Sequence, residues 1–131
     1  MIGIKVKDYY FSSEKMLELE MYIYDTFHSD GAGLSTTLRG MAEAMGTKIR
    51  YFDHNIAQIE ETAIRFLDEV ERLRLVDVDK DGRLPIILKE LELVKDKLGD
   101  KVPVSGTVTG PFTIATMVIG TEKVADRKSV V

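Results

Sequence analysis

Helical and extended sequence patterns alternate through the second half of the chain, and this alternation most limits the folds open to it. Pro85 stands in the first turn of a segment whose apolar residues recur at helical spacing until Gly99. Residues 101–108 predict a strand, and a second helix is expected to open at Gly110 and to extend to about Val124. A helix, a strand and a helix in this order are typical of parallel α/β units.

The first half of the chain repeats the alternation with weaker signals. Two serines precede a helix expected over residues 14–27, and the small residues at 31–34 predict a short strand. A helix over residues 36–45 is expected to end at Gly46, because a left-handed glycine commonly follows a helix. Three further segments predict a strand or hairpin excursion, a short helix and an acidic surface loop, at residues 47–64, 66–73 and 77–83.

Composition narrows the class of protein. The chain has 131 residues, of which 44% are hydrophobic and 31% charged, and this predicts one folded domain over residues 1–131. A net charge of -4 gives no electrostatic reason to bind nucleic acid. No apolar run approaches the length of a membrane span and no signal peptide is evident, so we expect no membrane partner and a cytoplasmic protein.

Several chemistries lack their residues in this sequence. The chain has no cysteine, which excludes disulfides, thiolate nucleophiles and sulfur-ligated metal sites within it. Its only histidines, His28 and His54, stand apart, and we expect surface or capping roles for both. Asp77, Asp79 and Asp81 resemble the start of a calcium loop, but Leu88 occupies the position of the closing bidentate glutamate, so a solvated loop is the better interpretation.

The segment VSGTVTGPFTIA at residues 104–115 is the sharpest local signal. It predicts a strand that enters a glycine-rich turn, with a proline just inside the next helix. Backbone N–H groups at such a helix start can receive a carboxylate or a phosphate. Alternatively, Gly106 and Gly110 only permit a tight turn and Thr109 only caps the helix, an interpretation that common turn geometry favours.

Three stretches of the sequence resemble the uroporphyrinogen decarboxylase-like superfamily. They are KMLELEMYIYDTF, AEAMG and DGRLPIILKELELVKDKLGDKVPVSGTVTGPFTIATMVIG, at residues 15–27, 42–46 and 81–120. The DGRLP and GPFT phrases look closer to the methylcobamide (corrinoid) methyltransferase branch. The resemblance implies an α/β fold, a partial (β/α)8 TIM barrel of two to three strand-helix units with a β excursion, because a whole barrel takes about 250 residues.

The resemblance also implies what the chain lacks. Thr37 occupies the position of the catalytic aspartate of the decarboxylases, nine residues before Gly46. The zinc of the methyltransferases is held by a histidine and cysteines from later in the barrel, so we expect no cofactor in this chain, whereas zinc and a corrinoid protein are implied for full-length relatives. The tail after Ala125 departs from the family, which favours a truncation or frameshift there.

Three functions follow as hypotheses. The leading one is a fragment of a corrinoid methyltransferase that is inactive alone. Its substrate pocket is expected to be lined by Thr37 and by residues of the second strand and the turn that follows it. The alternatives are a tetrapyrrole decarboxylase and a non-catalytic module that completes a partner chain. Open strand edges predict a homo-oligomer or a partner that completes the barrel, and the full-length relatives imply a small-molecule or corrinoid-protein substrate. The other pocket-lining candidates are Gly106, Thr109, Gly110, Pro111 and Phe112.

Overall fold

The computed structural model of the chain describes residues 3, 5–34 and 39–125. Its α-helices are α1 (Val6–Tyr10), α2 (Ser13–Phe27), α3 (Gly40–Ala44), α4 (Leu84–Leu98), α5 (Pro111–Ile119) and α6 (Thr121–Ala125). Its strands are β1 (Ala32–Leu34), β2 (Lys48–Arg50), β3 (Gln58–Glu61) and β4 (Val104–Gly106), and the segment η2 (Leu67–Arg72) is a 3-10 helix.

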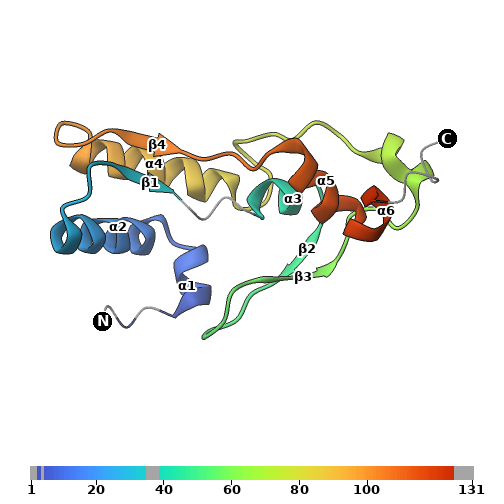
Figure 1. The fold of residues 1–131 in the computed structure, drawn as a ribbon, viewed down its shortest axis with the longest axis horizontal. Helices are drawn as coiled ribbons and strands as arrows, with labels where there is room; N and C mark the ends of the chain where they lie inside the picture. Colours follow the sequence, from blue (N-terminus) through green and yellow to red (C-terminus); the bar gives the residue numbers. More distant parts are fainter. Residues whose placement is uncertain (1–2, 4, 35–38, 126–131) are drawn as a thin grey trace.

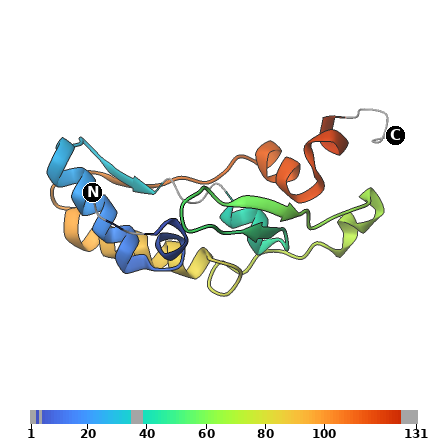
Figure 2. The ribbon, with the colours of Figure 1, turned by 90° about the horizontal axis from the view of Figure 1, so that it is seen from below.

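The strands β1 and β4 form a parallel pair, with Gly33 opposite Ser105. Parallel strands need a long crossover, and here it contains α3, the hairpin excursion and finally α4, which packs against both strands. Figure 2 shows α2 and α4 on the same side of the pair. The observed pair with its covering helices confirms the α/β, partial-barrel prediction.

Both strands run toward the same end of the molecule, where α3 and α5 lie (Figure 1). The excursion between α3 and α4 includes an antiparallel hairpin of β2 and β3, as residues 47–64 predicted. Residues on both sides of the hairpin bind α5. The Thr47 hydroxyl, before β2, donates to the Met117 carbonyl at 3.1 Å, and the Ile64 N–H, after β3, donates to the Val118 carbonyl at 3.0 Å. The excursion therefore holds α5 at the carboxyl ends of the strands.

The two long helices follow their sequence signals closely. Ser12 caps α2 by accepting a hydrogen bond from the Lys15 N–H at 3.3 Å, and His28 ends the helix with a left-handed φ of 49°. Pro85 lies in the first turn of α4, and Gly99 is its C-cap residue. The capping role expected for His28 is thus confirmed.

Other boundaries differ from the prediction. The helix expected to continue to Val124 breaks into α5 and α6, because Gly120 adopts a positive φ of 100° that ends the first helix. The second strand is shorter than residues 101–108, since Lys101 and Val102 instead close the turn after α4 by bonding back to the Leu98 carbonyl. The short helix α1 was not predicted at all.

Three apolar clusters hold the elements together. The first joins α2, α4 and both parallel strands, the second joins the start of α4 to α3, and the third joins α3, the excursion and α5. Two aromatic residues near the N-terminus pack against the hairpin, since the Tyr10 and Phe11 rings lie 5.2 and 4.7 Å from the ring of Tyr51. The buried residues of the clusters are Ala32, Ala42, Ile64, Leu84, Ile87, Val94, Leu98 and Val118.

Gly46 gives a first prediction. Its φ of 104° confirms the expected left-handed position after α3. We expect Gly46→Val to lower the free energy of unfolding by about 1–3 kcal/mol, because a β-branched residue is strained there. Urea denaturation followed by circular dichroism measures this loss. The same substitution at Gly110, whose φ is -64° and whose added Cβ meets nothing within 4 Å, should cost much less, and equal losses would contradict the strain argument.

Candidate functional site

The loop after β4 lies at the end of the molecule toward which the parallel strands point. In a barrel this end carries the active site, because the loops that follow the strands meet there. Gly110, and not Thr109, is the N-cap residue of α5, and Pro111 is at the start of the helix. Phe112 is 71% exposed, whereas Thr109 is half-buried.

The start of α5 presents backbone donors at this end. The first hydrogen bond within the helix runs from the Ile114 N–H to the Gly110 carbonyl at 3.0 Å. The N–H groups of the first turn have no partner within the helix, and Pro111 has no N–H, so Phe112 and Thr113 carry the first backbone donors of α5. Anion binding at this helix start therefore stays a prediction beside the interpretation of a plain turn.

Gly106 has a different position from the other candidates. A Cβ added to it would lie 3.1 Å from Leu91 Cδ1, so glycine lets the end of β4 approach α4 closely. The residue therefore faces the covering helix. Thr37 falls in the segment between β1 and α3, outside the described residues, so the structure does not place it relative to the loop.

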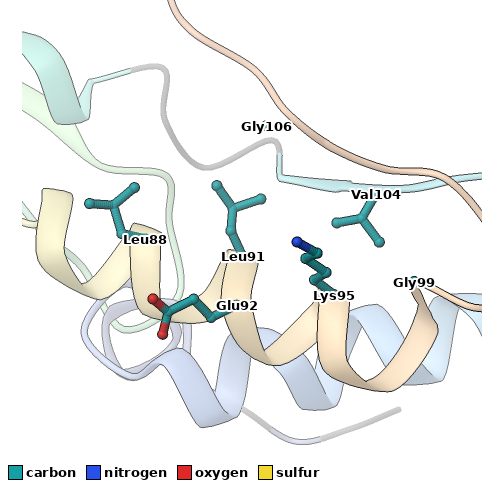
Figure 3. A pocket seen from close by; sticks show the side chains of 7 residues that line it. All are labelled: Leu88, Leu91, Glu92, Lys95, Gly99, Val104 and Gly106. Atoms are coloured by element: carbon teal, nitrogen blue, oxygen red, sulfur yellow. The ribbon is translucent and has the colours of Figure 1, made fainter.

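A groove runs between α4 and β4 and continues toward the loop. One part has a volume of about 480 Å³ and includes Glu92 and Lys95 on its wall, and the adjoining part of about 310 Å³ is almost entirely apolar. Figure 3 shows Leu88, Leu91 and Lys95 extending from the side of α4 that faces β4. Both parts share Leu88, Leu91 and Gly106.

A buried arginine organises the start of α4. The Arg83 side chain is 2% exposed, and its Nε donates to Glu43 Oε2 at 2.9 Å and to the Tyr51 hydroxyl at 2.7 Å. Its guanidinium also stacks over the rings of Tyr10 and Tyr51. Burial raises the pKa of Tyr51 above its usual value, the Arg83 charge opposes this rise and the Glu43 charge adds to it, so the phenol stays neutral.

Sequence reasoning missed this arginine, because Arg83 was assigned to the end of a surface loop. The loop assignment is correct for the preceding acids, which are paired on the surface, as in the Asp81 carboxylate with Arg74 and Asp77 with Lys80. Arg83 is instead the first member of the inward stripe of α4. Its spacing of four residues from Ile87 was the available signal.

The donor set does not fit the zinc site of the methyltransferases. The chain has no cysteine, and within residues 3, 5–34 and 39–125 no group of three or more histidine or acidic side chains could hold a metal ion. No step of chemistry can therefore be assigned to zinc held by these residues.

Among the described helices, none is both long enough and apolar enough to cross a bilayer.

Comparison with known proteins assigns the family. The family model described as uroporphyrinogen decarboxylase (URO-D) matches residues 1–129. The chain belongs to the uroporphyrinogen decarboxylase family. A uroporphyrinogen decarboxylase from Geobacter metallireducens is 27% identical over 106 residues, which cover 81% of this chain and 30% of that protein.

Methyltransferases are similar to the chain to the same extent. The methylcobamide:CoM methyltransferase MtaA of Methanosarcina barkeri is 26% identical over 119 residues, covering 90% of this chain and 35% of that protein. A methyltransferase from Methanosarcina mazei has the same fold over 92% of this chain and 36% of its own, with a TM-score of 0.81 and 21% identity. The chain thus spans about a third of the relatives that it matches.

Proposed function

We propose that this chain forms the first two strand-helix units of a methyltransferase barrel of the uroporphyrinogen decarboxylase family, and that it is inactive until the other units are present. The observation that carries the proposal is the parallel pair of β1 and β4, whose carboxyl ends lead toward α3 and into the loop before α5. In such a barrel that loop forms one wall of the substrate pocket. The reaction is methyl transfer from a methylcobamide, as the name of the Methanosarcina barkeri relative states.

Two observations favour methyl transfer over decarboxylation. The resemblance places the catalytic aspartate of the decarboxylases at Thr37, and threonine cannot carry the negative charge that stabilises a developing cation. The match to the Methanosarcina barkeri methyltransferase also extends over 90% of the chain, against 81% for the Geobacter metallireducens decarboxylase.

The groove between α4 and β4 supports the need for further units. Leu88, at 38% exposure, and Val108, at 78%, leave apolar surface along it that a following strand and helix of a barrel would cover. We propose that the chain on its own covers this surface by associating with another chain. Light scattering is then expected to show a dimer or a larger assembly, and a monomer at all concentrations would contradict it.

A graft tests the proposed reaction. This chain replaces the matching segment of the Methanosarcina barkeri methyltransferase and, separately, of the Geobacter metallireducens decarboxylase. We expect methyl transfer in the first graft and no decarboxylation in the second, while the isolated chain has neither activity. Decarboxylation by the second graft, with no methyl transfer by a folded first graft, would contradict the proposal. Methyl transfer by the isolated chain would contradict its inactivity.

Phe112 tests the pocket wall. In the methyltransferase graft, Phe112→Ala is expected to lower kcat/KM about 10-fold or more, because it removes an apolar wall of the pocket. The free energy of unfolding of the chain should change by no more than about 0.5 kcal/mol, since the ring is exposed. Phe27→Ala is the matched control, because Phe27 is also 71% exposed but lies at the end of α2. Equal activities of the two variants would remove Phe112 from the pocket.

A further inference from the structure

A carboxylic acid lies in the middle of the contact between α2 and α4. The Glu90 side chain belongs to the inward stripe of α4 and is 0% exposed. Neither of its carboxylate oxygens has a hydrogen-bond partner among the described residues. An ionised carboxylate in such a place would be strongly unfavourable, because burial removes its hydration and nothing replaces it.

A second acid faces Glu90 from α2. Glu20 is 9% exposed, and its carboxylate accepts a hydrogen bond from the Gly33 backbone N–H of β1. The Ala32 N–H donates to the Pro103 carbonyl beside β4, so Gly33, the next residue, turns its N–H to the opposite edge of β1. The Glu20 carboxylate therefore provides a hydrogen-bond acceptor for the backbone N–H that β1 presents on the edge away from β4.

Among the described residues, no cation shifts the pKa of either acid. From α1 the Tyr9 phenol faces both acids, and its pKa is raised by burial and then by the Glu90 charge, so it stays neutral. The strands β1 and β4 contain no ionisable residue. The Glu43 carboxylate of α3 is paired with Arg83, which also faces Tyr9 from the start of α4.

Protonation resolves this conflict. Burial and then the negative charge of Glu20 raise the pKa of Glu90 to about 8. Burial also raises the pKa of Glu20, but the Gly33 N–H opposes that rise because it favours the ionised form. The arrangement therefore favours a proton on Glu90, the carboxyl group that no hydrogen bond stabilises in its ionised form.

We propose that Glu90 and Glu20 form a proton-dependent latch, which holds α2 against α4 while Glu90 is protonated and releases it when Glu90 ionises. Leu17 and Met21 of α2 pack against the cluster that contains Val94 and Leu98, on the C-terminal side of Glu90 in α4, so the acid is placed where α2 can lift from the first half of α4. Release also removes Glu20 from the edge of β1, which frees the Gly33 N–H for another strand.

The sign of the pH dependence follows from linkage. The pKa of Glu90 in the folded chain, about 8, is above the ordinary pKa of 4.5 for a glutamate side chain. The stability that Glu90 contributes is therefore fully present below pH 4.5 and is lost as the pH rises through 8. Within that window the equilibrium constant for unfolding or release is expected to rise by up to about tenfold per pH unit.

Denaturant unfolding of the full chain between pH 5 and 9.5 tests the latch. The unfolding constant of the wild-type chain should rise with pH, and that of Glu90→Gln should rise far less, because glutamine keeps the shape and cannot ionise. Glu20→Gln should show a smaller rise than the wild type, since removal of the facing charge lowers the pKa of Glu90. Glu92→Gln is the control, because its side chain is 67% exposed on the same helix, and it should follow the wild type. An unchanged rise in Glu90→Gln overturns the proposal.

Two measurements on the wild-type chain decide the case if the variants fail to fold. Carboxyl carbon NMR gives the titration midpoint of Glu90 directly, and a midpoint near 4.5 overturns the proposal, whereas one near 8 supports it. Hydrogen exchange, corrected for the intrinsic effect of pH, should show α2 amides losing protection before those of α3 and α5 as the pH rises. Simultaneous loss in all three helices would indicate global unfolding and overturn the latch.

Discussion

Arg83→Ala is expected to lower the free energy of unfolding by about 3–5 kcal/mol, the usual cost of breaking a buried ion pair by removing one partner. The guanidinium is 2% exposed, and its loss leaves the 18% exposed Glu43 carboxylate without its cation. It also removes the bond from Arg83 Nη1 to the Tyr10 carbonyl at 3.3 Å, which ties α1 to α4. Urea denaturation followed by circular dichroism measures the loss.

Matched variants separate the ion pair from the positive charge itself. Arg72→Ala removes an arginine whose side chain is 80% exposed beside Glu69, and it should change stability by no more than about 0.5 kcal/mol. Arg83→Lys keeps the charge but loses the planar donor group, so an intermediate loss is expected. If Arg83→Ala lowered the free energy of unfolding as little as Arg72→Ala, the contacts of Arg83 with Glu43, Tyr51 and Tyr10 would not hold α3, the hairpin and α1 together.

The periodicity of α4 shows how much local sequence can reveal. Its apolar residues correctly predicted a helix that ends at Gly99. The same stripe includes Arg83 and Glu90 at helical spacing, but charged residues are normally assigned to the solvent side. Their burial depends on partners in α1, α2 and α3, which no pattern within α4 contains.

The candidate site was predictable in a similar, partial way. The glycines and proline after β4 located a turn at the carboxyl end of a strand and the start of α5. That Gly106 faces Leu91 rather than the loop depends on how closely the crossover returns α4 to the strand, which is a tertiary property. The family resemblance supplied the barrel, because strand pairing between distant segments leaves little trace in local patterns.

Leu98→Ala is expected to lower the free energy of unfolding by about 2–5 kcal/mol, the range for truncation of a buried leucine. Leu98 is 0% exposed and belongs to the cluster that joins α2, α4 and both parallel strands. The measurement is again denaturant unfolding, and Leu75→Ala is the matched control, because Leu75 is 96% exposed. Truncation of Leu75 should change stability by no more than about 0.5 kcal/mol.

The double variant of Arg83 and Leu98 tests whether α4 joins two separate regions. The two residues lie at opposite ends of the helix, about 22 Å apart at 1.5 Å per residue, and share no contact in their clusters. Residues this far apart should act independently, so the two losses are expected to add within about 0.5 kcal/mol. A total well below the sum would mean that either substitution already frees α2 and the strands from α4, and that the helix responds to damage at one end as a single unit.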